Sequence, residues 1–289
     1  MFIVKYKSLF IGLAIALVLA SFALMYTFGI RQGVDFTGGT IIETSYVAGM
    51  PASIDTAPLT AANIRSYKTG TSTYRFISTK SFDEMSPLVA TALTKGGYKF
   101  ETTQINTVGP TLGQELKQKA GLAIVFVILA ILAFIAFSFR EVSKPVSSWK
   151  YGIIAMVTLI HDIIVPTGAY VLLSHYYGAE VDTLFIIALL TILAISISDK
   201  IVVFDRIREN LKIGSNKNFN DVVGMSLRQT FTRSINTSVT VILALLALYF
   251  FGPVTTKFFA LTLTIGMIVG TYSSIFVASP LLTVWNKNK

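Results

Sequence analysis

The chain has 289 residues, of which 53% are hydrophobic and only 13% are charged. A soluble domain usually carries about 25% charged residues, so this composition indicates an integral membrane protein. The net charge of +9 accompanies no basic patch with interleaved aromatic residues, and we therefore expect no nucleic-acid partner. The absence of cysteine excludes disulfides, thiolate metal sites and a cysteine nucleophile.

The first apolar run extends from Leu9 to Ile30 and follows Lys5 and Lys7. It is longer than the hydrophobic region of a cleavable signal peptide, which has about 7–15 residues, and we predict a retained transmembrane helix. Small residues recur at every fourth position and predict a face for close helix packing, namely Ser8, Gly12, Ala16 and Ala20.

Residues 31–119 are polar, with short strand-like runs separated by turn residues. Strands are predicted at 40–47, 74–79 and 99–108, and helices at 60–67 and 81–95. Asn63 and Gly96-Gly97 are candidate boundary residues. The pattern predicts a small α+β domain.

Further apolar segments lie at 120–139, 151–174, 183–204, 234–251 and 258–285. Each is long enough to cross a bilayer of about 30 Å. The last contains a second row of small residues, at Gly266, Gly270, Ser274 and Ala278. The fold class expected is a polytopic α-helical membrane protein, with six transmembrane helices and one small α+β domain between helices 1 and 2.

Lysine and arginine residues gather in the N-terminal stretch, in the segments 140–150 and 205–233, and in the C-terminal tail. Positively charged loops of membrane proteins face the cytoplasm. We therefore predict that both termini and these two loops are cytoplasmic and that the 31–119 domain is extracytoplasmic.

Ionisable residues inside the spans are the candidate functional groups, because each costs about 2.5–3.5 kcal/mol on insertion scales. Asp199 lies in the fourth span, with Ser196 on the same helical face. Arg233 opens the fifth span and begins a polar stripe that continues through Asn236, Thr237 and Thr240. If this stripe meets the face of Asp199, the pair forms either a static ion pair that fixes helix register or a proton relay.

Three other polar residues admit structural or functional interpretations. Asp162 lies near the middle of the third span and is a weaker candidate for the relay. His161 is more simply explained as a hydrogen-bonded core histidine. Lys200 lies about 100° around the helix from Asp199, and we expect its side chain to extend to the cytoplasmic interface.

Enzymatic chemistry finds little support. The sequence has no Gly-rich phosphate loop of the P-loop type, and its two histidines leave no convincing metal site. We expect neither a cofactor nor an enzymatic activity.

Residues 34–39, Val-Asp-Phe-Thr-Gly-Gly, follow the first span and predict a tight turn into a strand.

Several motifs together resemble the SecD/SecF family of the bacterial Sec export machinery. The similar segments are 34–39, 109–116, 160–162, 202–210 and 270–275, and they occur in the family's order along all six spans. Residues 204–207, Phe-Asp-Arg-Ile, resemble the SecF branch, since SecD has Phe-Glu-Arg-Ile there. The residues that carry the family motifs are Asp35, Phe36, Gly38, Gly39, Asp205, Arg206 and Arg208.

The resemblance implies a multi-pass protein of the bacterial cytoplasmic membrane that uses the proton motive force to promote protein export. It implies SecD, the SecYEG channel, the translocating preprotein chain and the lipid bilayer as partners, with YajC and YidC as further candidates. It also implies a role in proton transport for Asp199 and Arg233.

Ser198 and Lys200 stand where the family usually has Asn and Thr, which leaves the detail of proton coupling open. Two alternatives remain from other functional classes. One is half of a proton-coupled exporter of the wider resistance-nodulation-division superfamily, and the other is a scaffold that stabilises the channel without moving protons.

Overall fold

The computed structural model describes residues 2–47, 54–70, 72–94, 99–138, 148–213 and 218–285. The chain divides into two compact units. The first comprises residues 1–29, 124–172 and 187–289, and the second comprises residues 30–123 and 173–186. Each unit is described by itself.

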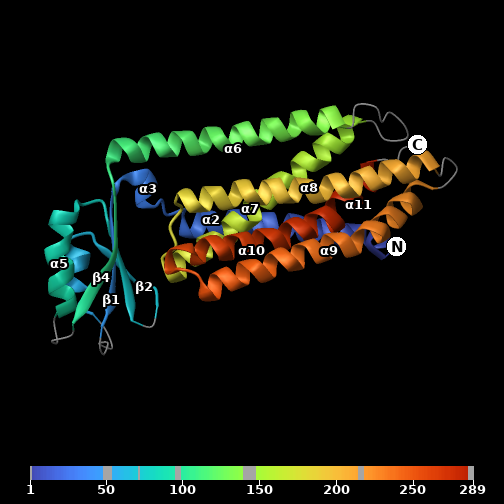
Figure 1. The fold of residues 1–289 in the computed structure, drawn as a ribbon. Helices are drawn as coiled ribbons and strands as arrows, with labels where there is room; N and C mark the ends of the chain where they lie inside the picture. The colour runs from blue at the N-terminus through green and yellow to red at the C-terminus, as the bar shows by residue number, and fades with distance from the viewer. Residues whose placement is uncertain are drawn as a thin grey trace. The chain divides into compact units, whose positions relative to one another are not determined.

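Long helices build the first unit (Figure 1). In chain order these are α1 (Phe2–Lys5), α2 (Lys7–Phe28), α6 (Pro110–Ser138), α7 (Ser148–Tyr177), α8 (Thr183–Ile213), α9 (Phe219–Phe251), η1 (Val254–Thr256), α10 (Lys257–Tyr272), η2 (Ser273–Ala278) and α11 (Ser279–Trp285). Within the described ranges, six helical segments are long and apolar enough to cross a membrane. The six predicted spans are therefore confirmed. Helices α8 and α9 also continue through most of the segment 205–233, which we expected as a loop.

The sixth span is not a uniform α-helix. Between α10 and α11 the residues Ser273–Ala278 form a π-helical segment, η2. Such segments are rare and occur frequently at functional sites. The hydroxyl group of Ser274 donates to the carbonyl of Gly270 at 2.7 Å, and Oγ of Ser273 lies 3.1 Å from the same carbonyl, at the beginning of the π-helical segment.

The third, fourth and sixth spans are the most buried in the first unit. Gly266 and Gly270 of α10 face Ile192 and Ser196 of α8, so the small residues predicted in the last span do form a packing face. The row of small residues predicted as a packing face in the first span is exposed in this chain. The buried side of α2 carries Ser21 instead, which lies against Gly168 of α7.

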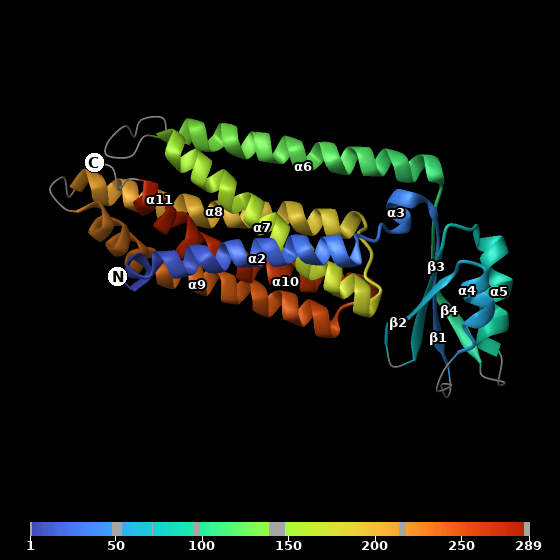
Figure 2. The ribbon, with the colours of Figure 1, turned by 180° about the vertical axis from the view of Figure 1, so that it is seen from behind.

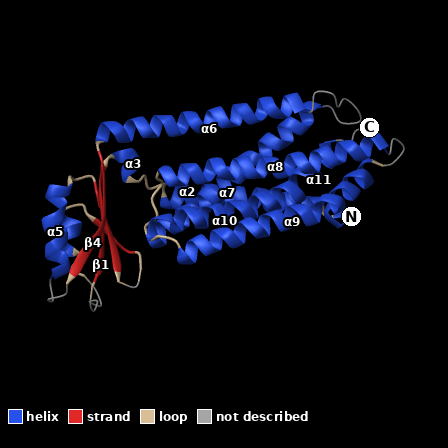
Figure 3. Ribbon diagram, in the orientation of Figure 1, coloured by secondary structure: helices blue, strands red, loops and turns tan. Residues whose placement is uncertain are grey.

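An antiparallel sheet with the strand order β2-β3-β1-β4 forms the centre of the second unit (Figure 3). Its strands are β1 (Gly39–Tyr46), β2 (Arg65–Lys68), β3 (Thr73–Ser78) and β4 (Phe100–Val108). Figure 2 shows α4 (Ala57–Ala61) and α5 (Phe82–Thr94) together on one face of this sheet. Apolar residues from the sheet and both helices form the core between them, among them Leu59, Phe76, Met85 and Leu93.

The predicted strands at 40–47, 74–79 and 99–108 and the helix at 81–95 are confirmed. The predicted helix at 60–67 is wrong. Asn63 adopts a left-handed φ of 57°, which ends α4 and turns the chain into the edge strand β2. Gly96-Gly97 lies outside the described residues.

Candidate functional site

A buried polar cluster centres on Asp162 of α7. Its Oδ1 accepts a hydrogen bond from Nδ1 of His161 at 2.9 Å. Its Oδ2 accepts from Nζ of Lys200 at 2.6 Å, from Oγ of Ser273 at 2.8 Å, and from Oγ of Ser196. The carboxylate is completely buried, so these donors take the place of water around its charge. Three spans thus converge on one side chain.

Lys200 does not extend to the interface, and that prediction is wrong. Its side chain is 0% exposed and forms an ion pair with Asp162. Its ammonium group also donates to Ser196 and, at 3.1 Å, to Ser273. Because three acceptors surround the ammonium group inside the protein, the charge is balanced without reaching solvent.

Asp199 faces a different environment from that of its neighbour Lys200, as the helical geometry predicts. Asp199 is half-buried and lines a narrow crevice between α8 and α10, together with Gly266, Gly270 and Thr271. The two glycines bring the α10 backbone close to α8 and leave Asp199 without a bulky neighbour there.

Arg233 acts on Asp199 through its charge but does not bond to it. Among the described residues, Asp199 and Arg233 share no hydrogen bond and no ion pair, although the positive charges of Arg233 and Lys200 both act on the carboxylate. Arg233 is exposed, and so are Asn236 and Thr237. Thr240, at the end of this stripe, is exposed too. The stripe therefore faces away from the core of this chain.

The motif that follows the first span holds the beginning of α8. In the second unit, Oδ2 of Asp35 accepts a hydrogen bond from the backbone N–H of Thr183 at 3.0 Å. Oδ1 of Asp182 accepts from the N–H of Phe185 at 2.8 Å. Two carboxylates thus satisfy N–H groups in the first turn of α8, where negative charge is favourable. No local pattern predicts this role, because Asp35 lies 148 positions from Thr183.

The motif's other residues shape its turn. Phe36 is buried, which fixes the short helix α3 (Val34–Thr37). Gly38 and Gly39 have φ values of 73° and 133°, which residues with a side chain rarely adopt. A Cβ atom on Gly39 would also collide with the carbonyl oxygen of Ser78. The predicted tight turn into a strand is therefore present, and it requires glycine.

Two acids in the connection between α7 and α8 have raised pKa values. Burial raises the pKa of Glu180 to about 7, and this outweighs the lowering effect of Arg65, whose guanidinium lies 2.6 Å from the carboxylate. Burial likewise raises the pKa of Asp182 to about 6. Both acids are groups that sequence analysis did not identify.

The motif at 202–210 joins the end of α8 to the beginning of α9. Oε1 of Gln229 accepts hydrogen bonds from Nε of Arg206 and from Nδ2 of Asn210, both at 2.8 Å. A guanidinium nitrogen of Arg208 lies 4.0 Å from Oδ1 of Asp205 on the same helix. These contacts fix the hairpin of two helices and support a structural role for the motif.

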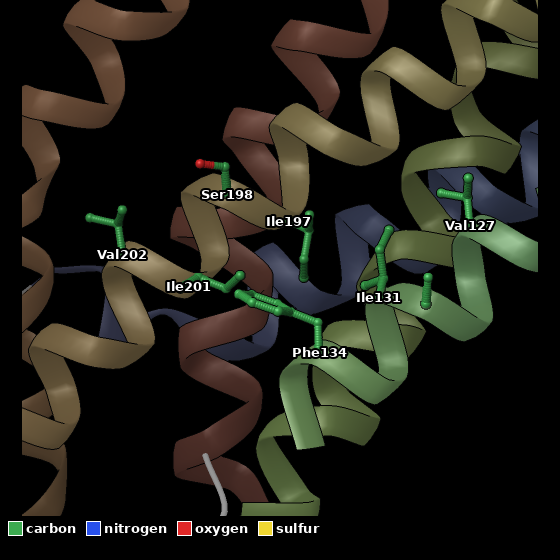
Figure 4. A pocket seen from close by; sticks show the side chains of 8 residues that line it. Val127, Ile131, Phe134, Ile197, Ser198, Ile201 and Val202 are labelled. Carbon is green, nitrogen blue, oxygen red and sulfur yellow. The ribbon is translucent and has the colours of Figure 1, made fainter. Parts of the chain in front are cut away.

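An apolar groove of about 530 Å³ separates α6 from α8 (Figure 4). Phe134 of α6 reaches toward Ile201 of α8, with Ile131 and Ile197 beside them. Its lining contains one polar residue, Ser198, and no charged one. The groove therefore lacks the chemistry of the Asp162 cluster and of Asp199.

In the described ranges, no group of three histidine or carboxylate side chains could hold a metal ion.

Comparisons with known proteins agree with this architecture. The family model of the C-terminal region of the protein export membrane proteins SecD and SecF matches residues 88–288, and that of their GG motif matches residues 23–48. The protein translocase subunit SecF of Thermobaculum terrenum is 38% identical over 298 residues, which cover 98% of this chain and 93% of that protein. SecF of Anaerolinea thermophila is 34% identical, with the same coverage of 98% and 93%.

A solved structure shows the same fold. The crystal structure of SecDF, a translocon-associated membrane protein from Thermus thermophilus, superimposes with a TM-score of 0.84 at 29% identity. The match covers 99% of this chain and 38% of the SecDF chain. A second crystal structure of SecDF, in its super-membrane-facing form, gives a TM-score of 0.68. The chain belongs to the SecD/SecF family of protein export membrane proteins, on the SecF side of that family.

Proposed function

We propose that this protein uses the proton motive force, together with SecD, to promote the translocation of proteins across the bacterial cytoplasmic membrane. The observation that carries the proposal is an acid, Asp199, in a membrane-spanning helix of a chain similar over 98% of its length to a protein translocase subunit. Ionisable residues inside membrane spans are costly and frequently mark ion and proton pathways.

The proposed partner is SecD, with the SecYEG channel and the preprotein chain beyond it. The chain spans only 38% of the SecDF protein that it resembles, so a second set of helices would complete the assembly. That protein is described as translocon-associated, which supports contact with the channel. We propose that both termini are cytoplasmic and that residues 31–119 lie outside the membrane, as the distribution of basic residues predicts.

Asp199 and Arg233 are the proposed proton relay. The charge of Arg233 already acts on Asp199 without a bond between them. If Arg233 moves closer, the carboxylate is favoured and a proton leaves, and if it moves away, the carboxylate takes a proton. A proton that crosses the membrane supplies about 2.3 kcal/mol per 100 mV of potential, which can drive such a movement.

The exposed stripe that begins at Arg233 supports a partner at this face. Arg233, Asn236, Thr237 and Thr240 would be costly against lipid, since polar side chains in the hydrocarbon region need polar partners. We propose that this stripe lies against SecD.

Ser196, which we expected beside Asp199, instead donates to Asp162.

The direct test is the variant Asp199→Asn in inverted membrane vesicles that contain the complete export machinery. Export should lose its dependence on the proton gradient, while export without a gradient should stay near the wild-type level. Asp221→Asn is the matched control, because Asp221 is an exposed acid near the beginning of α9. Unchanged gradient dependence in Asp199→Asn would refute the relay and favour a scaffold that moves no protons.

The variant Arg233→Ala separates the relay from a static ion pair. A relay predicts normal insertion with impaired export, measured by the amount of folded protein in the membrane and by transport in the same vesicles. Loss of insertion would instead support the static pair.

A further inference from the structure

His161 has one ring nitrogen that the structure leaves without a partner. The side chain is 6% exposed, and its Nδ1 contacts Asp162 at 2.9 Å. Its Nε2 is buried and forms no hydrogen bond within the described part of the chain. An unpaired polar atom inside a protein is costly, and in a native structure it indicates a role beyond packing.

The surroundings fix the tautomer of this ring. The carboxylate of Asp162 can only accept hydrogen bonds, so Nδ1 of His161 must be the donor. Ser196, Ser273 and Lys200 occupy the other carboxylate oxygen, and the carboxylate therefore remains an acceptor toward the ring. In the neutral imidazole the proton is then on Nδ1, and Nε2 presents a free lone pair.

Three titratable groups face the ring. These are Asp162 on α7, Lys200 on α8 and Tyr272 on α10, whose ring centroid lies 6.4 Å away. Helix α2 has no titratable residue at positions 8–25. Asp162 contacts the ring directly, while Lys200 contacts only the carboxylate of Asp162. Asp162 is therefore the group that orients the ring, as the acid does in other Asp–His pairs.

We propose that Nε2 of His161 is a proton-binding atom in the membrane-embedded core, separate from Asp199 and Arg233, and that Asp162 and Lys200 are its positioning residues. When a proton binds, an N–H bond forms at Nε2 and an O–H bond of a hydronium ion breaks, leaving water. Release reverses both steps. The inference rests on the proposed function, since it adds a second proton site to the same protein.

The sixth span gives this site a connection to helix geometry. Ser273, the first residue of the π-helical segment η2, donates to Asp162 and accepts from Lys200. A change of η2 into regular α-helix would rotate Ser273 relative to Asp162. The strength with which Asp162 holds His161 therefore depends on the state of the sixth span.

The test uses the chain's two histidines, His161 and His175. The full-length protein, labelled with ¹⁵N-histidine in lipid nanodiscs, gives one set of imidazole signals for each. At neutral pH we expect the His161 signals of the Nδ1–H tautomer, and on acidification their conversion to imidazolium. His175 is exposed and is the internal reference. A His161 ring that stays neutral while His175 titrates, or that carries its proton on Nε2 at neutral pH, would overturn the proposal.

Two variants complete the test. In Asp162→Leu/Lys200→Met the acceptor for Nδ1–H is absent, and the His161 signals should shift toward the Nε2–H tautomer. If this variant does not fold, the wild-type titration still decides. His161→Gln should lose the gradient-dependent part of export, whereas His175→Gln should keep it. A His161 that titrates, beside an Asp199→Asn variant that has lost the gradient dependence of export, supports both proposals. A neutral His161 with the same Asp199→Asn result refutes only the second site.

Discussion

Breaking the buried pair of Lys200 and Asp162 should be among the most damaging single changes in the first unit. Both side chains are 0% exposed, and Nζ lies 2.6 Å from Oδ2. Lys200→Met leaves the carboxylate of Asp162 without its counter-charge, which typically costs about 3–5 kcal/mol. The donors that remain, Ser196, Ser273 and His161, place this site at the lower end of the range.

The double variant Asp162→Leu/Lys200→Met should recover most of this loss, because apolar residues that replace a buried pair are often neutral in stability or better. The assay is reversible unfolding in mixed micelles, followed by circular dichroism, with the coupling free energy taken from the complete double-mutant cycle. Lys212→Met is the matched control, since Lys212 is an exposed lysine on the same helix. The reasoning fails if Lys200→Met costs no more than Lys212→Met, or if the double variant is less stable than Lys200→Met alone.

Three further predictions concern the second unit. Gly39→Ala should prevent the second unit from folding, because the alanine Cβ would collide with the Ser78 carbonyl and alanine rarely adopts a φ of 133°. The assay is limited proteolysis, in which the second unit should be cleaved rapidly. A protease-resistant variant would contradict this prediction. Asp35→Ala should cost about 1 kcal/mol of stability through the lost cap at Thr183, measured by thermal unfolding, and Asp35→Asn should recover part of it. The raised pKa of Glu180 means that the folded state binds a proton at Glu180 more tightly than the unfolded state does. Glu180 therefore stabilises the folded state increasingly as the pH falls from about 7 toward 4.5. This stabilisation is lost as the pH rises through 7. Glu180→Gln should remove that dependence, worth at most about 3 kcal/mol, and a pH profile of stability identical to wild type would refute it.

The spans and most strands could be predicted from sequence because they depend on local pattern. An apolar run of bilayer length specifies a span whatever its neighbours are, and the alternating runs that form β1, β3 and β4 behave similarly. The segment 60–67 failed because a single left-handed residue, Asn63, divides a helical turn from an edge strand. The row of small residues in the first span is exposed in this chain, because periodicity identifies a face without showing which neighbour it meets.

The polar cluster could be predicted only in part. The sequence places Asp162 and Lys200 within spans, but their pairing joins positions 38 apart on different helices. The expectation that Lys200 extends to the interface assumes that no acid lies within its reach, and the neighbouring span supplies one. Of the two caps on α8, the one from Asp35 depends likewise on a contact distant in sequence, so no local pattern identifies it. The cap from Asp182 is local, because Phe185 lies only three positions away.

Helix α8 carries Lys200 and Asp199 on consecutive positions, and therefore on different sides of one rigid rod. Its first turn is held by Asp35 and Asp182. Translation along the helix axis would break these hydrogen bonds, while a small rotation about the axis would stretch them less. Rotation would displace both ionisable groups at once, in directions about 100° apart. The two groups therefore move together with any rotation of α8.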